Sequence, residues 1–309
     1  MITSLFRKST PLNYSLVILG LVFTFFLYFL RHITPEGSDS NLLIRLVSLG
    51  LVLGTMFMAN FVVKKNGISK DSAYTVLFFW LFLMAFPNVL IQPQLLISNF
   101  FILLATRRIV SLHSLKDPKE KVFDASVWVF IAALFHFWSI LFIALIFIAI
   151  LFHVARDYRN WFLPPIAFLS VAVVFVFISL FFNTGWIPML LAQSVYDFKL
   201  DYFTEAYQNL TLSIYATIAL FFVVSLLFSL SNRPLILHPT YKKIISAFFI
   251  GLAVYFISPN KSNDLLVFSF APLAMIATAH IEMPQAQWKK EVVLAVLILF
   301  SFIVFFSQL

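Results

Sequence analysis

Residues 73–105 read AYTVLFFWLFLMAFPNVLIQPQLLISNFFILLA, an apolar block of 33 residues with a polar group near its middle. A single helix of this length would extend about 50 Å, whereas the hydrocarbon core of a bilayer is about 30 Å thick. The sequence therefore predicts two short helices with a turn at 92–94. The break is marked by prolines and amides, which are Pro87, Asn88, Gln92, Pro93 and Gln94.

A second apolar block of 33 residues covers 122–154 and is interrupted around Phe135, His136 and Phe137. It also predicts two short helices. Helices of this length either cross the membrane as a hairpin or form a re-entrant hairpin within it. Both forms return to the side that they entered, and the sequence leaves both open.

The composition points to a membrane protein. Of the 309 residues, 62% are hydrophobic and 11% are charged, whereas an ordinary soluble chain is about 25% charged. These proportions exclude a water-soluble enzyme, a disordered protein and a soluble nucleic-acid-binding domain, because lipid is needed to cover so much apolar surface. The chain has no cysteine, which excludes disulfides, cysteine-ligated metals and thiol catalysis.

Further apolar runs are expected to form single helices. Together with the four short helices they predict an all-α polytopic membrane protein of about eleven hydrophobic segments. We expect one integral membrane domain over 1–309 that contains an external amphipathic loop at 183–209. Gly50 and Gly54 form a pair of small residues that favours close helix packing. The single runs are 14–30, 42–63, 163–182, 210–230, 244–257, 265–279 and 292–306.

Lysine and arginine indicate the orientation, because cytoplasmic loops of membrane proteins are enriched in them. With the N-terminus in the cytoplasm, 17 of the 21 basic residues fall in inner loops. The external ones are Arg31, Arg45, Lys199 and Lys261. This distribution supports a hairpin for both 33-residue blocks, because a single span in either would move later basic loops to the other side, and it predicts an external C-terminus. The net charge of +8 follows from this topology and predicts no nucleic-acid partner.

The first external loop, 31–41, gathers polar and charged residues. Glu36 and Asp39 are carboxylates at the membrane surface, where a carboxylate can act as a general base or hold a divalent metal. Arg31, and Arg45 one turn into the next span, can grip a phosphate through their forked donors. The alternative is an ordinary polar turn, with Arg45 extending to the interface.

Three further residues are candidate site residues. His136 is the one ionisable residue deep within an apolar block, and intramembrane ionisable groups are functional candidates. Lys261 and Asp264 bracket a polar turn at the head of the span 265–279, where a cation can face a phosphate. The alternatives are a histidine hydrogen-bonded to a neighbouring helix and a solvated turn with an internal charge pair.

The loop 183–209 contains a helical stripe. Leu191, Val195, Phe198 and Tyr202 recur at the spacing of one helix face, with polar residues between them. This pattern predicts an amphipathic helix on the outer interface. Such a helix would be either a lid over a lipid-linked substrate or a connector that rests on lipid.

These features resemble the polytopic GT-C glycosyltransferases, which use polyprenyl-phosphate sugars. The resemblance rests on the carboxylate loop at Glu36 and Asp39, on AALFHFWS at 132–139, and on PNKSNDLL at 259–266 followed by APL at 271–273. The chain also resembles inner-membrane proteins of Bacteroidetes that have no assigned activity. The resemblance covers the whole chain in layout and implies transfer of a polyprenyl-phosphate-linked sugar at the outer face of the bacterial inner membrane.

The resemblance also implies roles for residues. Asp39 would be the base or a metal-linked carboxylate, with Glu36 as its substitute. Arg31, Arg45 and Lys261 would hold the lipid phosphate. The implied partners are membrane lipid and a polyprenyl-phosphate sugar, and a divalent metal is the cofactor to be considered.

Two other functions remain open. The interrupted blocks also fit the discontinuous helices of a transporter or lipid flippase. The 40 phenylalanines and the scarcity of intramembrane polar groups also fit a non-catalytic subunit of an envelope assembly. The sequence contains no G-x-S-x-G, no H-E-x-x-H and no Walker loop, so serine-hydrolase, metalloprotease and NTPase chemistry have no support.

Overall fold

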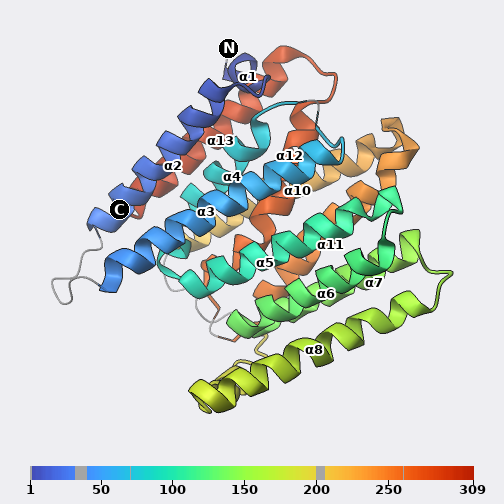
Figure 1. Cartoon of the computed structure of the whole chain (residues 1–309). Helices are drawn as coiled ribbons and strands as arrows, with labels where there is room; N and C mark the ends of the chain where they lie inside the picture. Colours follow the sequence, from blue (N-terminus) through green and yellow to red (C-terminus); the bar gives the residue numbers. More distant parts are fainter. Residues whose placement is uncertain (1, 32–39, 70, 200–205, 260) are drawn as a thin grey trace. The chain divides into compact units, whose positions relative to one another are not determined.

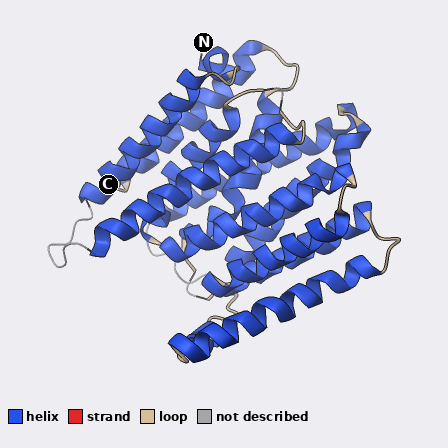
Figure 2. Cartoon of the chain, in the orientation of Figure 1, coloured by secondary structure: helices blue, strands red, loops and turns tan. Residues whose placement is uncertain are grey.

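The computed structural model describes residues 2–31, 40–69, 71–199, 206–259 and 261–309. Every regular element in these ranges is helical (Figure 2), as predicted. Eight described stretches are long and apolar enough to cross a bilayer, so the chain is a multi-pass membrane protein. They are Pro11–Arg31, Leu42–Lys65, Pro93–Ser114, Arg159–Phe182, Gln208–Asn232, Leu235–Ile257, Asn263–Ile281 and Gln287–Ser307.

Each apolar run predicted to be one helix is a helix, and several extend past the run into polar residues. The helix α11 begins six residues before its run because Pro239 fits the first turn of a helix, where no N–H bond is needed. The bounds are α2 Pro11–Arg31, α3 Ser40–Lys65, α8 Arg159–Phe182, α10 Ala206–Ser229, α11 His238–Ile257, α12 Val267–Ile281 and α13 Gln287–Ser307 (Figure 1).

The first 33-residue block is broken, as predicted. The helix α4 (Tyr74–Ala85) is followed by the 3₁₀ helix η1 (Pro87–Ile91) and by α5 (Pro93–Val110). The break begins earlier than the predicted turn at 92–94, because Pro87 disfavours helical backbone at the preceding Phe86. Pro93 then suits the first position of α5.

The second block is interrupted at His136, also as predicted. The helix α6 (Pro118–Phe135) ends there, and η3 (Phe137–Phe142) leads into α7 (Ile143–His153). His136 is extended, with φ −143° and ψ 106°. Because α6 packs against both η3 and α7, this block folds back on itself.

The chain divides into two compact units. Unit 1 comprises Met1–Leu96, Phe203–Asn232 and Phe270–Leu309. At its centre lies α4, all of whose residues are buried, and α2, α3 and α13 pack on it. Trp80 of α4 lies against Gly20 of α2, and its Nε1 donates a hydrogen bond to Thr24 Oγ1 at 3.2 Å. The short α1 (Ile2–Phe6) packs on α13.

Unit 2 comprises Ile97–Tyr202 and Arg233–Ser269. Its helix α6 packs along α8, and α11 packs against α7 and η3. The face of α8 that these contacts leave open is strongly apolar, since Val173, Phe177 and Phe181 are 67%, 71% and 79% exposed.

The remaining 3₁₀ helices of the described chain are η2 Ser111–Ser114, η4 Leu230–Asn232, η5 Leu235–Leu237 and η6 Asn263–Leu266.

The predicted amphipathic helix over 191–202 is wrong for its described part. The helix α9 covers Trp186–Ala192, and residues 195–199 have no helical structure. Tertiary hydrogen bonds replace the helical ones. The Asp197 N–H donates to the Ile257 carbonyl at 3.1 Å, and Trp138 Nε1 donates to the Val195 carbonyl at 3.2 Å.

Candidate functional site

A cluster of polar groups lies at the C-terminal end of α11 in unit 2, and we call it the α11 cluster. It comprises His136, Asp197, Ser258, Lys261 and Asp264. His136 comes from the break after α6 and Asp197 from the segment 195–199, whereas Ser258 and Lys261 follow α11 and Asp264 lies in η6. Three segments distant in sequence therefore meet within one unit.

His136 is joined to Ser258. Its Nε2 lies 3.1 Å from Ser258 Oγ, and its ring faces Phe268 with centroids 5.6 Å apart. The Ser258 hydroxyl donates its proton to the Val254 carbonyl at 2.6 Å. Because a hydroxyl has one proton, the Nε2 of His136 is then the donor in the other bond, and Nδ1 of the neutral ring is an acceptor.

Lys261 is held by the segment 195–199. Its Nζ donates to the Asp197 carbonyl, and the Asp197 carboxylate accepts the N–H of Lys199 at 2.8 Å. Lys261 is 8% exposed and Asp264 is 5% exposed. An ammonium group has three donors, and burial makes each of its polar contacts more valuable than in water. Lys261 is thus a buried cation at the end of a helix.

Asp264 lies in the first turn of η6, directly before α12. A carboxylate at the start of a helix is favoured by the peptide dipoles. Three of the predicted site residues, His136, Lys261 and Asp264, therefore belong to the α11 cluster. Ser258 and the Asp197 carbonyl were missed, because a loop serine and a backbone oxygen have no distinctive sequence pattern.

Arg31 and Arg45 are not among the residues of the α11 cluster. Arg31 is in the last turn of α2 and is exposed. Arg45 of α3 is half-buried, and its guanidinium carbon is 5.0 Å from the centre of the Phe29 ring, a cation–π contact. Both belong to unit 1. Glu36 and Asp39 lie outside the described residues.

The described ranges contain no group of three His, Asp or Glu side chains with a metal-binding arrangement. The suggestion of a divalent metal rested on Glu36 and Asp39, and the α11 cluster does not supply an alternative ligand set. We therefore derive no chemical step through a metal.

A second buried polar group, missed from the sequence, lies at the opposite end of α11. Lys243 is fully buried, and its Nζ donates to the carbonyls of Ile109 and Val110 at 2.8 and 3.2 Å. The same Nζ lies 3.1 Å from His153 Nε2. These three acceptors match the three donors of the ammonium form of the side chain, so Lys243 joins α11 to the ends of α5 and α7. In the sequence Lys243 could not be told from its neighbour Lys242.

Comparison with known proteins gives no relative. No family model matches the chain, and no curated protein and no solved structure matches it. The fold and the α11 cluster are therefore the observations from which a function is argued.

Proposed function

We propose that this protein is a GT-C-like glycosyltransferase that uses a polyprenyl-phosphate-linked sugar at the outer face of the bacterial inner membrane. The observation that supports this most is the α11 cluster, in which a buried cation, a buried carboxylate and a histidine gather at one end of a helix. A reaction of a lipid phosphate needs a cation for the leaving phosphate and a base for the acceptor hydroxyl.

The proposal includes a topology of about eleven segments, with a cytoplasmic N-terminus and an external C-terminus. Hydrogen bonds support it. They join the break at 136–138 to residues 195–199 and 257–258, and Lys261 to Asp197. The charge count assigns the loops that contain Lys199 and Lys261 to the outer side. At the other end of α11 hydrogen bonds join Ile109, His153 and Lys243, all assigned to the inner side.

In the proposed reaction the base takes the proton of the acceptor hydroxyl. The acceptor oxygen then bonds to the anomeric carbon of the sugar, and the bond from that carbon to the phosphate oxygen breaks. The electron pair leaves on the polyprenyl phosphate, whose charge Lys261 stabilises. The resemblance assigns the base to Asp39 or Glu36 and further phosphate contacts to Arg31 and Arg45.

Transfer from a radiolabelled polyprenyl-phosphate sugar by the purified protein tests the proposal. We expect Lys261→Gln to lower kcat by about 100-fold, since loss of one stabilising group for a developing charge has such an effect. Lys199→Gln is the matched control, because Lys199 is an exposed cation of the segment that Lys261 contacts. Asp39→Asn and Glu36→Gln test the base.

The outcome that contradicts the proposal is absence of transfer for all donors tried, together with Asp39→Asn and Glu36→Gln cells that keep the wild-type phenotype. Equal activity of the Lys261→Gln and Lys199→Gln proteins would show that Lys261 does not stabilise the leaving phosphate.

A transporter or lipid flippase is the second candidate. The breaks at Phe86–Gln92 and at His136 support it, because transporters build substrate sites from discontinuous helices. Uptake into proteoliposomes distinguishes the two functions. Substrate flux that is lost in His136→Gln, without sugar transfer, would favour transport.

A further inference from the structure

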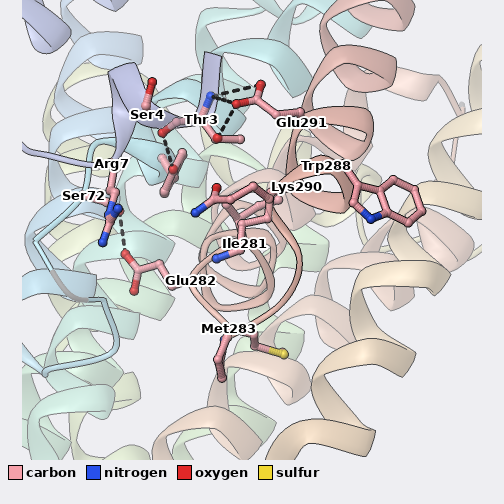
Figure 3. A pocket seen from close by; sticks show the side chains of 13 residues that line it. Thr3, Ser4, Arg7, Ser72, Ile281, Glu282, Met283, Trp288, Lys290 and Glu291 are labelled. Carbon is pink, nitrogen blue, oxygen red and sulfur yellow. Dashed lines mark hydrogen bonds between the residues drawn. The ribbon is translucent and has the colours of Figure 1, made fainter. Parts of the chain in front are cut away.

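Unit 1 contains a cavity of about 710 Å³ that takes no part in the proposed reaction. Its walls come from both ends of the chain, namely α1, the start of α4, the end of α12 and the start of α13. Figure 3 shows its lining side chains. The volume is within the range of small-molecule sites, and charged residues from distant parts of the sequence face it.

Two carboxylates are fixed at the cavity wall. Glu291 accepts hydrogen bonds from the Thr3 N–H at 3.2 Å and from Thr3 Oγ1 at 2.6 Å. Glu282 accepts from the hydroxyls of Ser69 and Ser72, the latter at 2.6 Å. Figure 3 shows Glu291 against Thr3 and Glu282 against Ser72. Hydrogen-bonded in this way, each carboxylate holds its negative charge in a fixed place.

A hydrogen bond between α1 and α4 fixes the same side of the cavity. The hydroxyl of the buried Tyr74 donates to the Thr3 carbonyl at 2.6 Å. Thr3 is thus bonded both to Glu291 of α13 and to Tyr74 of α4. Hydrogen bonds between α1, α4 and α13 therefore hold this side of the cavity in place.

Two cations line the same cavity, Arg7 and Lys290. The lining therefore carries charges of both signs, because Glu282 and Glu291 lie beside these cations, and Glu291 also has the chain's amino terminus as a partner. A simple anion would leave both carboxylates facing it, and a simple cation would leave Arg7 and Lys290 facing it. A ligand that carries both a negative and a positive group fits this lining better than either.

The position of the cavity selects among such ligands. It lies where the candidate span Gln287–Ser307 begins, which is the level of lipid headgroups. Trp288 lines it and is 65% exposed, and tryptophan is enriched at membrane–water interfaces because its ring is amphipathic. Figure 3 shows Trp288 and Lys290 on the same helix.

We propose that this cavity binds the headgroup of phosphatidylethanolamine. The phosphate would be held by Arg7 and Lys290, and the primary ammonium would donate to the carboxylate of Glu282. Phosphatidylcholine lacks the N–H donors, and phosphatidylglycerol lacks the positive group. The site therefore discriminates between lipids that share the same phosphate.

Native mass spectrometry of the purified full-length protein tests this with equimolar phosphatidylethanolamine, phosphatidylcholine and phosphatidylglycerol of identical acyl chains. We expect about ten-fold greater retention of phosphatidylethanolamine, since that is the order of effect of one lost charge-assisted hydrogen bond. Arg7→Gln should lower its retention, whereas Lys8→Gln should not, because Lys8 is exposed and does not line the cavity.

Glu282→Gln keeps an oxygen to accept from Ser69 and Ser72 but loses the charge, so it should reduce the preference over phosphatidylcholine without unfolding the wall. Equal retention of the three lipids would overturn the proposal, as would equal effects of Arg7→Gln and Lys8→Gln. Soluble O-phosphoethanolamine shares the headgroup chemistry. If it binds saturably to lipid-free protein while the three lipids are retained equally, the ligand is a soluble phosphoethanolamine and the proposal of a lipid ligand is wrong. The assay contains no sugar donor, so its outcome is independent of the proposed transfer reaction.

Discussion

Lys243 shows how one buried side chain can hold helix ends together. The last carbonyls of a helix have no intrahelical partner, and this amine bonds those of Ile109 and Val110 at the end of α5. We expect Lys243→Met to lower the free energy of unfolding by about 2 kcal/mol, because buried acceptors lose their donor. Lys242→Met is the matched control, since Lys242 is exposed. Thermal unfolding in one detergent measures both, and equal melting temperatures would contradict the expectation.

Gly251 is required by close packing. A Cβ atom built at this position would lie 2.9 Å from the Phe268 carbonyl oxygen, and a backbone atom cannot move aside easily. Gly251→Ala should therefore destabilise unit 2 by about 1–3 kcal/mol. Gly50→Ala is the control, because nothing lies within 4 Å of the corresponding Cβ. A melting temperature lowered as much by Gly50→Ala as by Gly251→Ala would show the steric argument to be wrong.

Asp157 fixes the start of α8. The Arg159 N–H and then Lys119, whose Nζ is 3.1 Å away, lower the pKa of this carboxyl. A lowered pKa means that the folded chain favours the charged form, so the contribution is present above about pH 4 and is lost as the pH falls through the lowered pKa. The difference in melting temperature between wild type and Asp157→Asn should shrink below pH 4. A difference that stays constant from pH 6 to pH 3 would contradict this.

The helices were largely predictable from the sequence, and their irregular parts were not. Apolar runs located the described spans, and the proline and histidine interruptions located both breaks. The stripe at Leu191, Val195 and Phe198 has helical spacing, yet 195–199 is not helical. Its backbone bonds Trp138 and Ile257 instead. Local periodicity cannot reveal such competing bonds from distant residues.

The topology of the whole chain can be tested directly, because the protein has no natural cysteine. Under the proposed topology in the bacterial inner membrane, Lys199→Cys should react with a membrane-impermeant maleimide that reaches the periplasm of intact cells. Lys116→Cys should react only after the inner membrane is permeabilised, because the charge count places it inside. Labelling of Lys116→Cys in intact cells, or failure of Lys199→Cys to react there, would refute the proposed orientation.

The candidate site was predictable only in part. The sequence singled out His136, Lys261 and Asp264 because polar groups are rare in this chain, and all three belong to the α11 cluster. The cavity of unit 1 was missed. No sequence pattern singled out Glu282 or Glu291, because their hydrogen bonds to Ser72 and Thr3 join residues more than 200 positions apart.

The open face of α8 makes the surrounding hydrocarbon a component of the native state. Val173, Phe177 and Phe181 are exposed and belong to the candidate span Arg159–Phe182, so we expect acyl chains to cover this side in a bilayer. The packing of α8 on α6 therefore depends on the detergent or lipid that covers this face after solubilisation. Long-tailed surfactants or nanodiscs should preserve this edge of the molecule, and harsh short-tailed surfactants should compete with α6 for it.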